Sequence, residues 1–379
     1  MGTPTMTGPV DEAEHGPRDI IFRGSLDEVQ EHYLRNGWTD GLPIVPPTRD
    51  RVERFVAASG RDPEASMGVL RPERREATVW SCAVNAVMAG CRPEYMPVLL
   101  AIVDAICDPR FHIQDAGSTP GWEPLICVSG PVVERLDFNA GTGVMRVGRQ
   151  ANTSIGRFLR LYMRNIAGLR IPPGATDQAA IGYTFNVALA ESDSVVREAG
   201  LEPVRHSLGF SVSDSIVVVQ SARAVSPPIY TSGDTAEEHL QGLRDVIEAT
   251  LTPSVYRAYV RQRQSPLIVL SPGVTRLLTS VGLDRLAIQR YFARECWIDV
   301  HDVEKFAWRT GLTEFSTVAA ARSMDIEIRQ SGSAQLVPMF IDPAEIMLVV
   351  AGNPGRNQSR AYFDNGQQGT RIVRRVLEV

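Results

Sequence analysis

The sequence predicts an α/β (α+β) fold in two domains. Five short runs have the composition of strands, at residues 124–129, 185–190, 215–220, 267–270 and 346–350. Helical patterns bounded by capping residues and glycines separate these runs. At 379 residues the chain is also long enough to form two cores.

The expected division is a disordered leader, a larger N-terminal mixed α/β catalytic domain and a smaller C-terminal α/β domain, over residues 1–18, 19–258 and 259–379. In the C-terminal domain each apolar run leads into a Gly/Pro turn, which favours a short, largely parallel sheet. Open α/β sheets bind ligands at the carboxyl ends of their strands. We therefore expect an active site in the cleft between the two domains.

The first elements are set by capping and turn residues. Ser25 and Glu28 form a capping-box pattern that opens a helix ending at Gly37. Residues 38–48 (WTDGLPIVPPT) combine an Asp-Gly turn with prolines that force an extended path. Such a segment is typical either of a pocket wall or of a brace between helices. Thr48 is placed to cap a helix over residues 49–59.

The stretch over residues 76–99 carries two of the five cysteines, Cys82 and Cys91. It predicts a helix to about Ala89, a stop at Gly90 and a second helix from Pro93. Cys82 then lies in mid-helix among small and apolar neighbours. It is either a buried hydrophobic residue or a nucleophile.

A Gly/Asn-rich loop over residues 139–156 leads into a helix predicted over 154–167. Backbone amides at such a helix start can bind an anion, but neither a Walker A nor a dinucleotide pattern is present. No cofactor is predicted. Five arginines in this region favour a solvated helix face over a phosphate or carboxylate site: Arg146, Arg149, Arg157, Arg160 and Arg164.

Further along, Asp234 is expected to cap a helix over residues 235–249 that places His239 in its second turn. A histidine near a helix start has a lowered pKa and can act as a neutral base.

Composition excludes several classes of protein. The net charge is −5 and no basic stripe is present, which argues against nucleic-acid binding. Five unevenly spaced cysteines do not form a disulfide framework, and none lies at zinc spacing from another Cys or His. There is neither a signal-peptide core nor a run of about 18 apolar residues. We expect a cytoplasmic protein with reduced thiols and no membrane partner.

With no zinc pattern and no G-x-S-x-G motif, a cysteine is the natural nucleophile. Cys82, Cys91, Cys107, Cys127 and Cys296 are the candidates, and the run around Cys127 indicates packing inside a strand. Asp108 and Asp115 are the candidate acids after the Cys82 helix. Among the histidines, His239 lies near a helix start and His301 has Asp299 and Asp302 as sequence neighbours, and the choice of base stays open.

Several motifs resemble one family. Residues 39–48 (TDGLPIVPPT), 85–95 (NAVMAGCRPEY), 155–157 (IGR) and the Ala351-Gly352 turn are similar to those of the UGSC-motif family. The likeness spans nearly the whole chain. That family usually has a small aliphatic residue at the position of Cys82. With a cysteine there, the chain resembles one branch of the family, the Dieckmann cyclases that close tetramic acid, tetronate or pyridone rings.

The resemblance implies a two-domain enzyme with a Cys–His–Asp triad. Cys82 matches the nucleophile, Asp115 or Asp108 the acid, and His239 the base ahead of His206 and His301. The implied substrate is a polyketide–peptide β-ketoamide held as a carrier-protein thioester. The chain transfers to Cys82, and intramolecular C–C ring closure then releases a tetramic acid.

Two alternatives stay open: a cysteine-dependent thioester hydrolase or acyltransferase, and a non-catalytic small-molecule binding protein. The oligomeric state is open as well, with a homodimer as one option.

Overall fold

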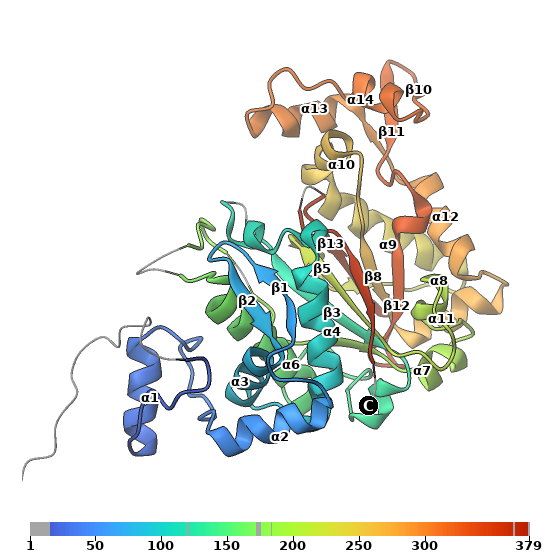
Figure 1. Ribbon diagram of the computed structural model, residues 1–379. Coiled ribbons are helices and arrows are strands. Elements are labelled where there is room, and N and C mark those ends of the chain that lie inside the picture. The colour runs from blue at the N-terminus through green and yellow to red at the C-terminus, as the bar shows by residue number, and fades with distance from the viewer. Residues whose placement is uncertain (1–15, 120, 172–175, 183, 367, 378–379) are drawn as a thin grey trace, which may run out of the picture.

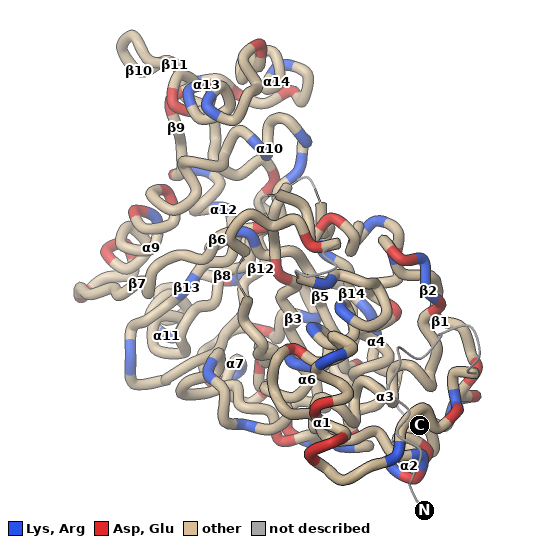
Figure 2. The backbone as a smooth tube through the Cα atoms, turned by 90° about the vertical axis from the view of Figure 1, so that its left-hand side faces the viewer, with Lys and Arg blue, Asp and Glu red and all other residues tan. Residues whose placement is uncertain are grey.

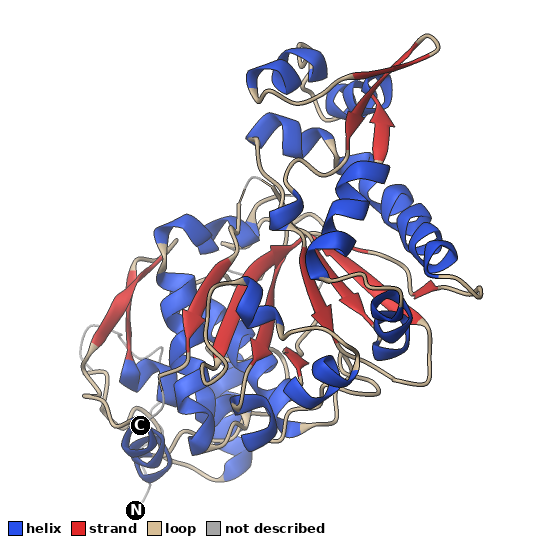
Figure 3. Cartoon of the chain, turned by 90° about the vertical axis from the view of Figure 1, so that its right-hand side faces the viewer, coloured by secondary structure: helices blue, strands red, loops and turns tan. Residues whose placement is uncertain are grey.

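The computed structural model describes residues 16–119, 121–171, 176–182, 184–366 and 368–377 (Figure 1). These residues form a mixed α/β protein with four sheets. Two larger sheets lie in the middle of the molecule with helices outside them (Figure 3). A lobe that carries β9 (Trp297–Asp299), β10 (Arg329–Ser331) and β11 (Ala334–Pro338) projects away from this body (Figure 2).

The first large sheet has the strand order β14-β5-β3-β4. Its strands are β3 (Glu123–Ser129), β4 (Leu189–Glu191), β5 (Ile216–Ala222) and β14 (Ile372–Arg375). β3 pairs antiparallel with β5 and parallel with β4, and β14 pairs antiparallel with β5. The predicted strands at 124–129 and 215–220 are confirmed, whereas of the strand predicted at 185–190 only the last two residues belong to β4.

The second large sheet has the order β12-β8-β13-β6, and β7 also pairs with β13. Its strands are β6 (Ala224–Val225), β7 (Ile229–Tyr230), β8 (Leu267–Leu270), β12 (Met347–Val350) and β13 (Gln358–Phe363). Only the β8–β12 pair is parallel. The prediction of a largely parallel sheet is therefore wrong, because the chain turns back after β12 and β13 runs antiparallel to β8.

The two large sheets pack face to face. Side chains alternate between the faces of a strand, and in β3 Ile126 and Val128 face a helical core while Leu125 and Cys127 belong to the cluster shared with the second sheet. In β8, Leu267 and Val269 complete that shared cluster and the alternate residues face a second helical core. The order of layers is helices, sheet, sheet, helices, and Cys127 is packing between the sheets.

The helices that precede β4 in the chain are α1 (Leu26–Arg35), α2 (Arg49–Ser59), α3 (Val79–Ala89), α4 (Met96–Cys107), α5 (Val132–Arg135) and α6 (Gln150–Tyr162). Those that follow are α7 (Asp193–Glu198), α8 (Val204–Ser207), α9 (Ala236–Leu251), α10 (Tyr256–Arg261), α11 (Pro272–Ser280), α12 (Arg285–Glu295), α13 (Val300–Arg309) and α14 (Thr317–Ser323). Within the described residues, every helix is too short or too polar to cross a membrane.

The smaller sheets are a hairpin and a three-stranded sheet. The hairpin joins β1 (Ser66–Leu70) to β2 (Arg75–Thr78). The three-stranded sheet consists of β9 (Trp297–Asp299), β10 (Arg329–Ser331) and β11 (Ala334–Pro338), all antiparallel.

Local sequence signals account for most helix ends. The predicted capping box of Ser25 and Glu28 is present, and Gly90 ends α3 with a φ of 79°, a conformation that glycine adopts without strain. Asp234 does not cap α9. Thr235 does, because its hydroxyl accepts the Glu238 N–H while the Glu238 carboxylate accepts the N–H groups of both Asp234 and Thr235.

The pairing of strands crosses the predicted domain boundary at residue 259. β14 joins the first sheet from the C-terminal end of the chain, and β6 and β7 join the second sheet from before the boundary. The division into two domains stays a prediction. Of the expected leader, residues 1–15 lie outside the described residues.

A buried carboxylate connects the two large sheets. Glu191, at the end of β4, accepts the Val350 N–H of β12 at 3.0 Å and the Val204 N–H at 2.6 Å. Ser129 Oγ donates to the same carboxylate at 3.2 Å. Burial raises the pKa of Glu191, although Arg285 and these N–H donors act in the opposite direction. Its oxygens satisfy two buried amides that no sheet ladder satisfies.

We predict that Glu191→Gln lowers the free energy of unfolding by roughly 2–4 kcal/mol, because an amide offers one oxygen to donors that two oxygens now satisfy. Urea denaturation measures the change. Glu198→Gln, an exposed position on α7, is the matched control and should alter stability by less than about 0.5 kcal/mol. Equal stability of the two variants would contradict this role for Glu191.

Candidate active site

Four segments meet around a pocket of about 510 Å³, here called the Glu123 pocket. They are the end of α1 with the loop after it, Ala116 with the start of β3, α6 with the π-helical turn that continues it, and the described residues between 171 and 186. The charged and polar residues that line it include Asp40, Trp122, Glu123, Arg160, Arg164, Asp177 and Thr184. All lining residues lie between residues 34 and 186, so the pocket is inside the predicted N-terminal domain and not between the two.

α6 forms the floor of the pocket. Arg160 and Arg164 are four residues apart and therefore lie on the same face. Gly156 lets α6 lie directly against the 186–187 backbone, since a Cβ at this position would come within 2.4 Å of Val187 N. This close approach brings Thr184 and Asn186 to the same pocket as the two arginines.

α6 also holds the loop before residue 43. Arg157 donates two hydrogen bonds of 2.9 Å to the Asp40 carboxylate. Arg164 Nε donates to Gly37 O at 2.5 Å, and Asn165 Nδ2 donates to Trp38 O at 3.1 Å. Burial raises the pKa of Asp40, but the hydrogen bonds and charge of Arg157 outweigh it, so the net pKa is below its usual value.

Glu123 is the buried carboxyl of the pocket, with 5% of its surface exposed. Thr184 Oγ1 donates to its Oε1 at 3.2 Å, and Arg160 Nη1 lies 3.7 Å from its Oε2. Burial raises the pKa of Glu123 to about 7, against the opposing charge of Arg160 and the hydrogen bond from Thr184. A carboxyl with such a pKa can both accept and donate a proton near neutral pH.

The pocket also holds donors that protein acceptors leave free. Arg164 forms no ion pair with any described residue, and burial followed by the charges of Arg160 and Arg170 lowers its pKa. Trp122 is 3% exposed, and its indole Nε1 has no hydrogen-bond partner among the described residues. Buried donors normally find partners. An acceptor-rich group on a ligand would pair with the Arg164 guanidinium, which lines the pocket.

The rim of the pocket is apolar. Leu42, Ile171 and Ile181 line it with exposed side chains, and Ile181 is 98% exposed. An apolar rim over a charged floor matches a ligand with a polar head and a hydrocarbon body. Leu42 belongs to the 38–48 segment, for which the sequence left a pocket wall and a helix brace open, and in the structure this residue lines a pocket.

Cys82 lies outside the pocket. It is in the middle of α3, is 0% exposed and belongs to the helical core of the first sheet. Burial raises the pKa of its thiol well above the usual range, and the nearby Cys91 adds to the effect more than Arg61 offsets it. A thiol in this environment has little thiolate at neutral pH.

The three candidate bases are in other places. His239 is 1% exposed, with Nδ1 2.7 Å from Thr231 Oγ1 and Nε2 3.2 Å from Gly233 O. His206 Nδ1 lies 3.0 Å from Glu202. His301 is exposed at the start of α13, where its backbone N–H donates to Asp299.

The candidate acids have partners of their own. Asp108 binds Arg110 and Arg374, whose hydrogen bonds, Arg110 first, hold its pKa well below the usual range. Asp115 lies 3.7 Å from His112, where the chain forms two short 3₁₀ turns, and burial raises the pKa of Asp115. No hydrogen bond or ion pair among the described residues joins Cys82, His239, Asp108 and Asp115. The structure does not bring them together, and the triad stays a prediction.

The residues that sequence reasoning missed are Glu123, Arg160 and Arg164. The expectation of a solvated arginine face is wrong for Arg157 and Arg160, which are 18% and 23% exposed in their side chains and face acids. An acid at the start of an apolar strand and arginines at positions 157, 160 and 164 of one helix were the available signals. Their convergence depends on the tertiary structure.

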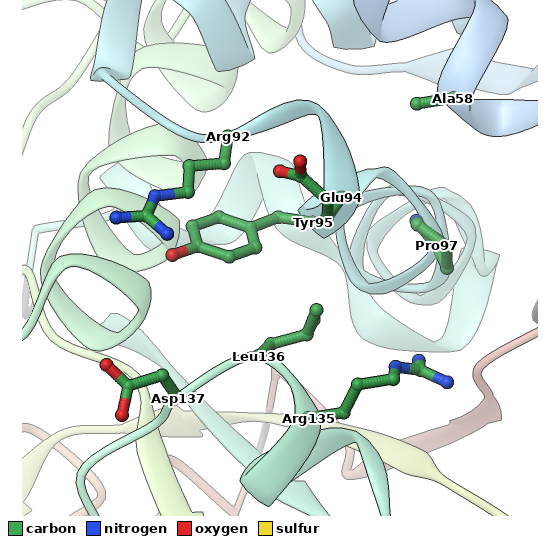
Figure 4. A pocket seen from close by; sticks show the side chains of 8 residues that line it. All are labelled: Ala58, Arg92, Glu94, Tyr95, Pro97, Arg135, Leu136 and Asp137. Atoms are coloured by element: carbon green, nitrogen blue, oxygen red, sulfur yellow. The ribbon is translucent and has the colours of Figure 1, made fainter.

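A second hollow of about 520 Å³ lies beside α5 (Figure 4). Arg92, Tyr95, Arg135 and Asp137 point into it from two sides. Arg92 Nε donates to Gln150, and Asp137 accepts from Arg149. This hollow offers balanced charges and no buried carboxyl, so the Glu123 pocket is the stronger candidate.

Neither site suggests a metal. Within the described parts of the chain, no three His, Cys, Asp or Glu side chains are arranged to hold an ion. Acidic and basic residues are interspersed along the chain without a stripe of one sign (Figure 2).

We predict that iodoacetamide at pH 7.5 leaves Cys82, Cys127 and Cys296 unlabelled in the native protein, because all three are buried. Peptide mass spectrometry gives the labelled positions, and a urea-unfolded sample, labelled at all five cysteines, is the control. Rapid labelling of native Cys82 would show an activated thiol and would support its predicted role as the nucleophile of a triad.

The difference in free energy of unfolding between Glu123→Gln and the parent protein should change in favour of the variant as pH rises. The folded pKa of Glu123 is about 7, above the ordinary 4.5. The native carboxyl therefore keeps its proton while the unfolded one loses it, and parent stability falls between these two values. The variant lacks this loss, so its relative free energy of unfolding should rise by on the order of 3 kcal/mol between pH 4 and pH 8. Urea denaturation across this range tests it, and a pH-independent difference would contradict the raised pKa.

Comparison with protein-family models, with curated proteins and with solved structures gives no match for this chain. The family resemblance of its motifs stays an expectation, and a function is inferred below from the residues of the Glu123 pocket.

Proposed function

We propose that the protein is an enzyme that removes a proton from a carbon next to a carbonyl group, with Glu123 as the general base. The observation that carries this proposal is a buried carboxyl of pKa about 7 beside the guanidinium of Arg160. A base with a pKa near the working pH is the most effective one. A carbon between two carbonyls is acidic enough for such a base.

Removing this proton leaves negative charge on the carbonyl oxygen. Arg160 and Arg164 line the same pocket and provide N–H donors and positive charge for that oxygen. Donors fixed in advance in a buried site stabilise a developing oxyanion far more than water does.

The Dieckmann cyclisation implied by the motif resemblance belongs to this class of reaction. Glu123 takes the proton from the carbon between the two carbonyls of a β-ketoamide. The carbanion attacks the thioester carbonyl of the same chain, so a C–C bond forms and the C–S bond breaks. The leaving thiolate of the carrier receives the proton from Glu123, and a tetramic acid is released.

In this route the carbanion attacks the thioester directly. The buried Cys82 thiol and the separate positions of His239 and the two aspartates favour it over an acyl-Cys82 intermediate. Thioesters are reactive enough for direct attack by a carbanion. The proposed partner is an acyl chain on a carrier protein, and the exposed Leu42, Ile171 and Ile181 support an apolar body on that chain.

The test uses the N-acetylcysteamine thioester of N-(3-oxodecanoyl)glycine and follows ring formation by mass spectrometry. We expect Glu123→Gln to lower kcat/KM by roughly 100- to 10,000-fold, the usual contribution of a general base. The parent kcat/KM should rise with pH through about 7, because the base must be ionised. In Arg160→Gln this rise should move to higher pH, because the Arg160 charge lowers the pKa of Glu123.

Matched variants decide between the routes. Glu198→Gln, on the exposed face of α7, should keep the parent rate. Cys82→Ala should keep it too under direct attack, whereas its loss would establish the acyl-Cys82 route. Release of the free acid would indicate a thioester hydrolase, and binding without turnover would indicate a non-catalytic binding protein. Full activity of Glu123→Gln would refute the proposal.

A further inference from the structure

A third cavity, of about 520 Å³, is lined by residues of α1, α2 and α3 together with Trp38 and residues 46–48. Figure 1 shows these three helices at the N-terminal end of the chain. Residues 16–23 form the outer wall of this cavity, which we call the strap cavity. Its apolar lining consists of Ile20, Ile21, Phe22, Val29, Tyr33, Trp38, Pro46, Pro47, Val52, Trp80 and Val84.

Aromatic rings dominate the inner surface of the strap cavity. Tyr33 and Trp38 pack edge to face with their centroids 5.5 Å apart, and Trp80 contributes from α3. Burial raises the pKa of Tyr33 to about 12. Rigid rings around a cavity in the usual range of ligand sites, about 300–1,000 Å³, are suited to an apolar or aromatic body.

The outer wall is fastened at one end. Trp80 Nε1 donates to Pro17 O at 2.9 Å, and Arg49 Nη2 donates to Arg18 O at the same distance. Arg18 also forms an ion pair of 2.5 Å with Glu64. Beyond these contacts, residues 19–23 line the cavity with the apolar side chains of Ile20, Ile21 and Phe22.

The charged residues that line the strap cavity are three arginines, Arg18, Arg23 and Arg49, and one acid, Asp19. With Glu64 neutralising Arg18, two guanidinium groups still face one carboxylate. The balance favours a ligand with one negative charge.

We propose that the strap cavity binds an amphipathic anion, with a hydrocarbon or aromatic body inside and one carboxylate at the arginine rim. The site is separate from the Glu123 pocket, although the same loop lines both: Gly37 and residues 39–42 face the Glu123 pocket, while Trp38 and residues 46–48 face the strap cavity. The proposal does not depend on the reaction assigned to Glu123.

Isothermal titration calorimetry with octanoate, and with 1-octanol as the uncharged probe of equal length, tests the proposal. Octanoate should bind the parent protein more tightly than 1-octanol. Val84→Phe fills the cavity and should weaken octanoate at least about tenfold, while Val281→Phe, at an exposed site elsewhere, should not change it. Arg23→Gln should weaken octanoate by about threefold and leave 1-octanol unchanged.

Glu123→Gln separates the two sites, because it should bind octanoate as the parent does even if it abolishes turnover. The proposal is overturned if octanoate does not bind, if 1-octanol binds equally well, if Val84→Phe and Val281→Phe bind octanoate alike, or if Glu123→Gln loses binding. Thermal unfolding of each variant establishes that it is folded, and Arg23→Gln, at an exposed position, tests the charge without disturbing the core.

Discussion

The close packing of α6 against its neighbours is the constraint on which the candidate site depends. Gly156 lets the helix contact the 186–187 backbone, and Asn152 exchanges hydrogen bonds with Ala188 at 2.8 and 2.9 Å. At its other end the helix continues into a π-helical turn, Met163–Ala167, which carries Arg164 and Asn165 toward the 37–38 backbone. Such turns occur frequently at functional sites. One helix thus joins three segments that are distant in sequence.

Local signals were enough to predict several helices and the central buried strands, but not the smaller strands or the assembly of the sheets. Ser25, Gly90 and Asp284 mark helix ends through hydrogen bonds and φ angles that depend on neighbouring residues only. The orientation of β13 depends instead on where the chain goes after β12, which no local pattern encodes. The π-helical turn is similarly invisible, because its residues have an ordinary helical composition. The face-to-face packing of the two sheets could not be predicted either. Both faces of each strand are buried, so its sequence is apolar throughout and does not show which side chains face the other sheet.

The candidate site shows the same division between local and tertiary information. Cysteine is rare and reactive, so it draws attention in a sequence, but its reactivity depends on exposure and charge, and Cys82 has neither the exposure nor a basic partner in this structure. Glutamate is common, and Glu123 becomes chemically distinctive only because folding buries it next to Arg160. The raised pKa is a tertiary property of a residue that the sequence presents as the edge of a strand.

The central claim is that Glu123 titrates near neutral pH in the folded protein. Infrared difference spectroscopy of the carboxyl stretch, recorded against pH for the parent and for Glu123→Gln, measures this directly and needs no substrate. The account predicts one protonated carboxyl that ionises with a pKa of about 7 and is missing from the variant. Identical spectra of the two proteins above pH 5.5 would contradict it.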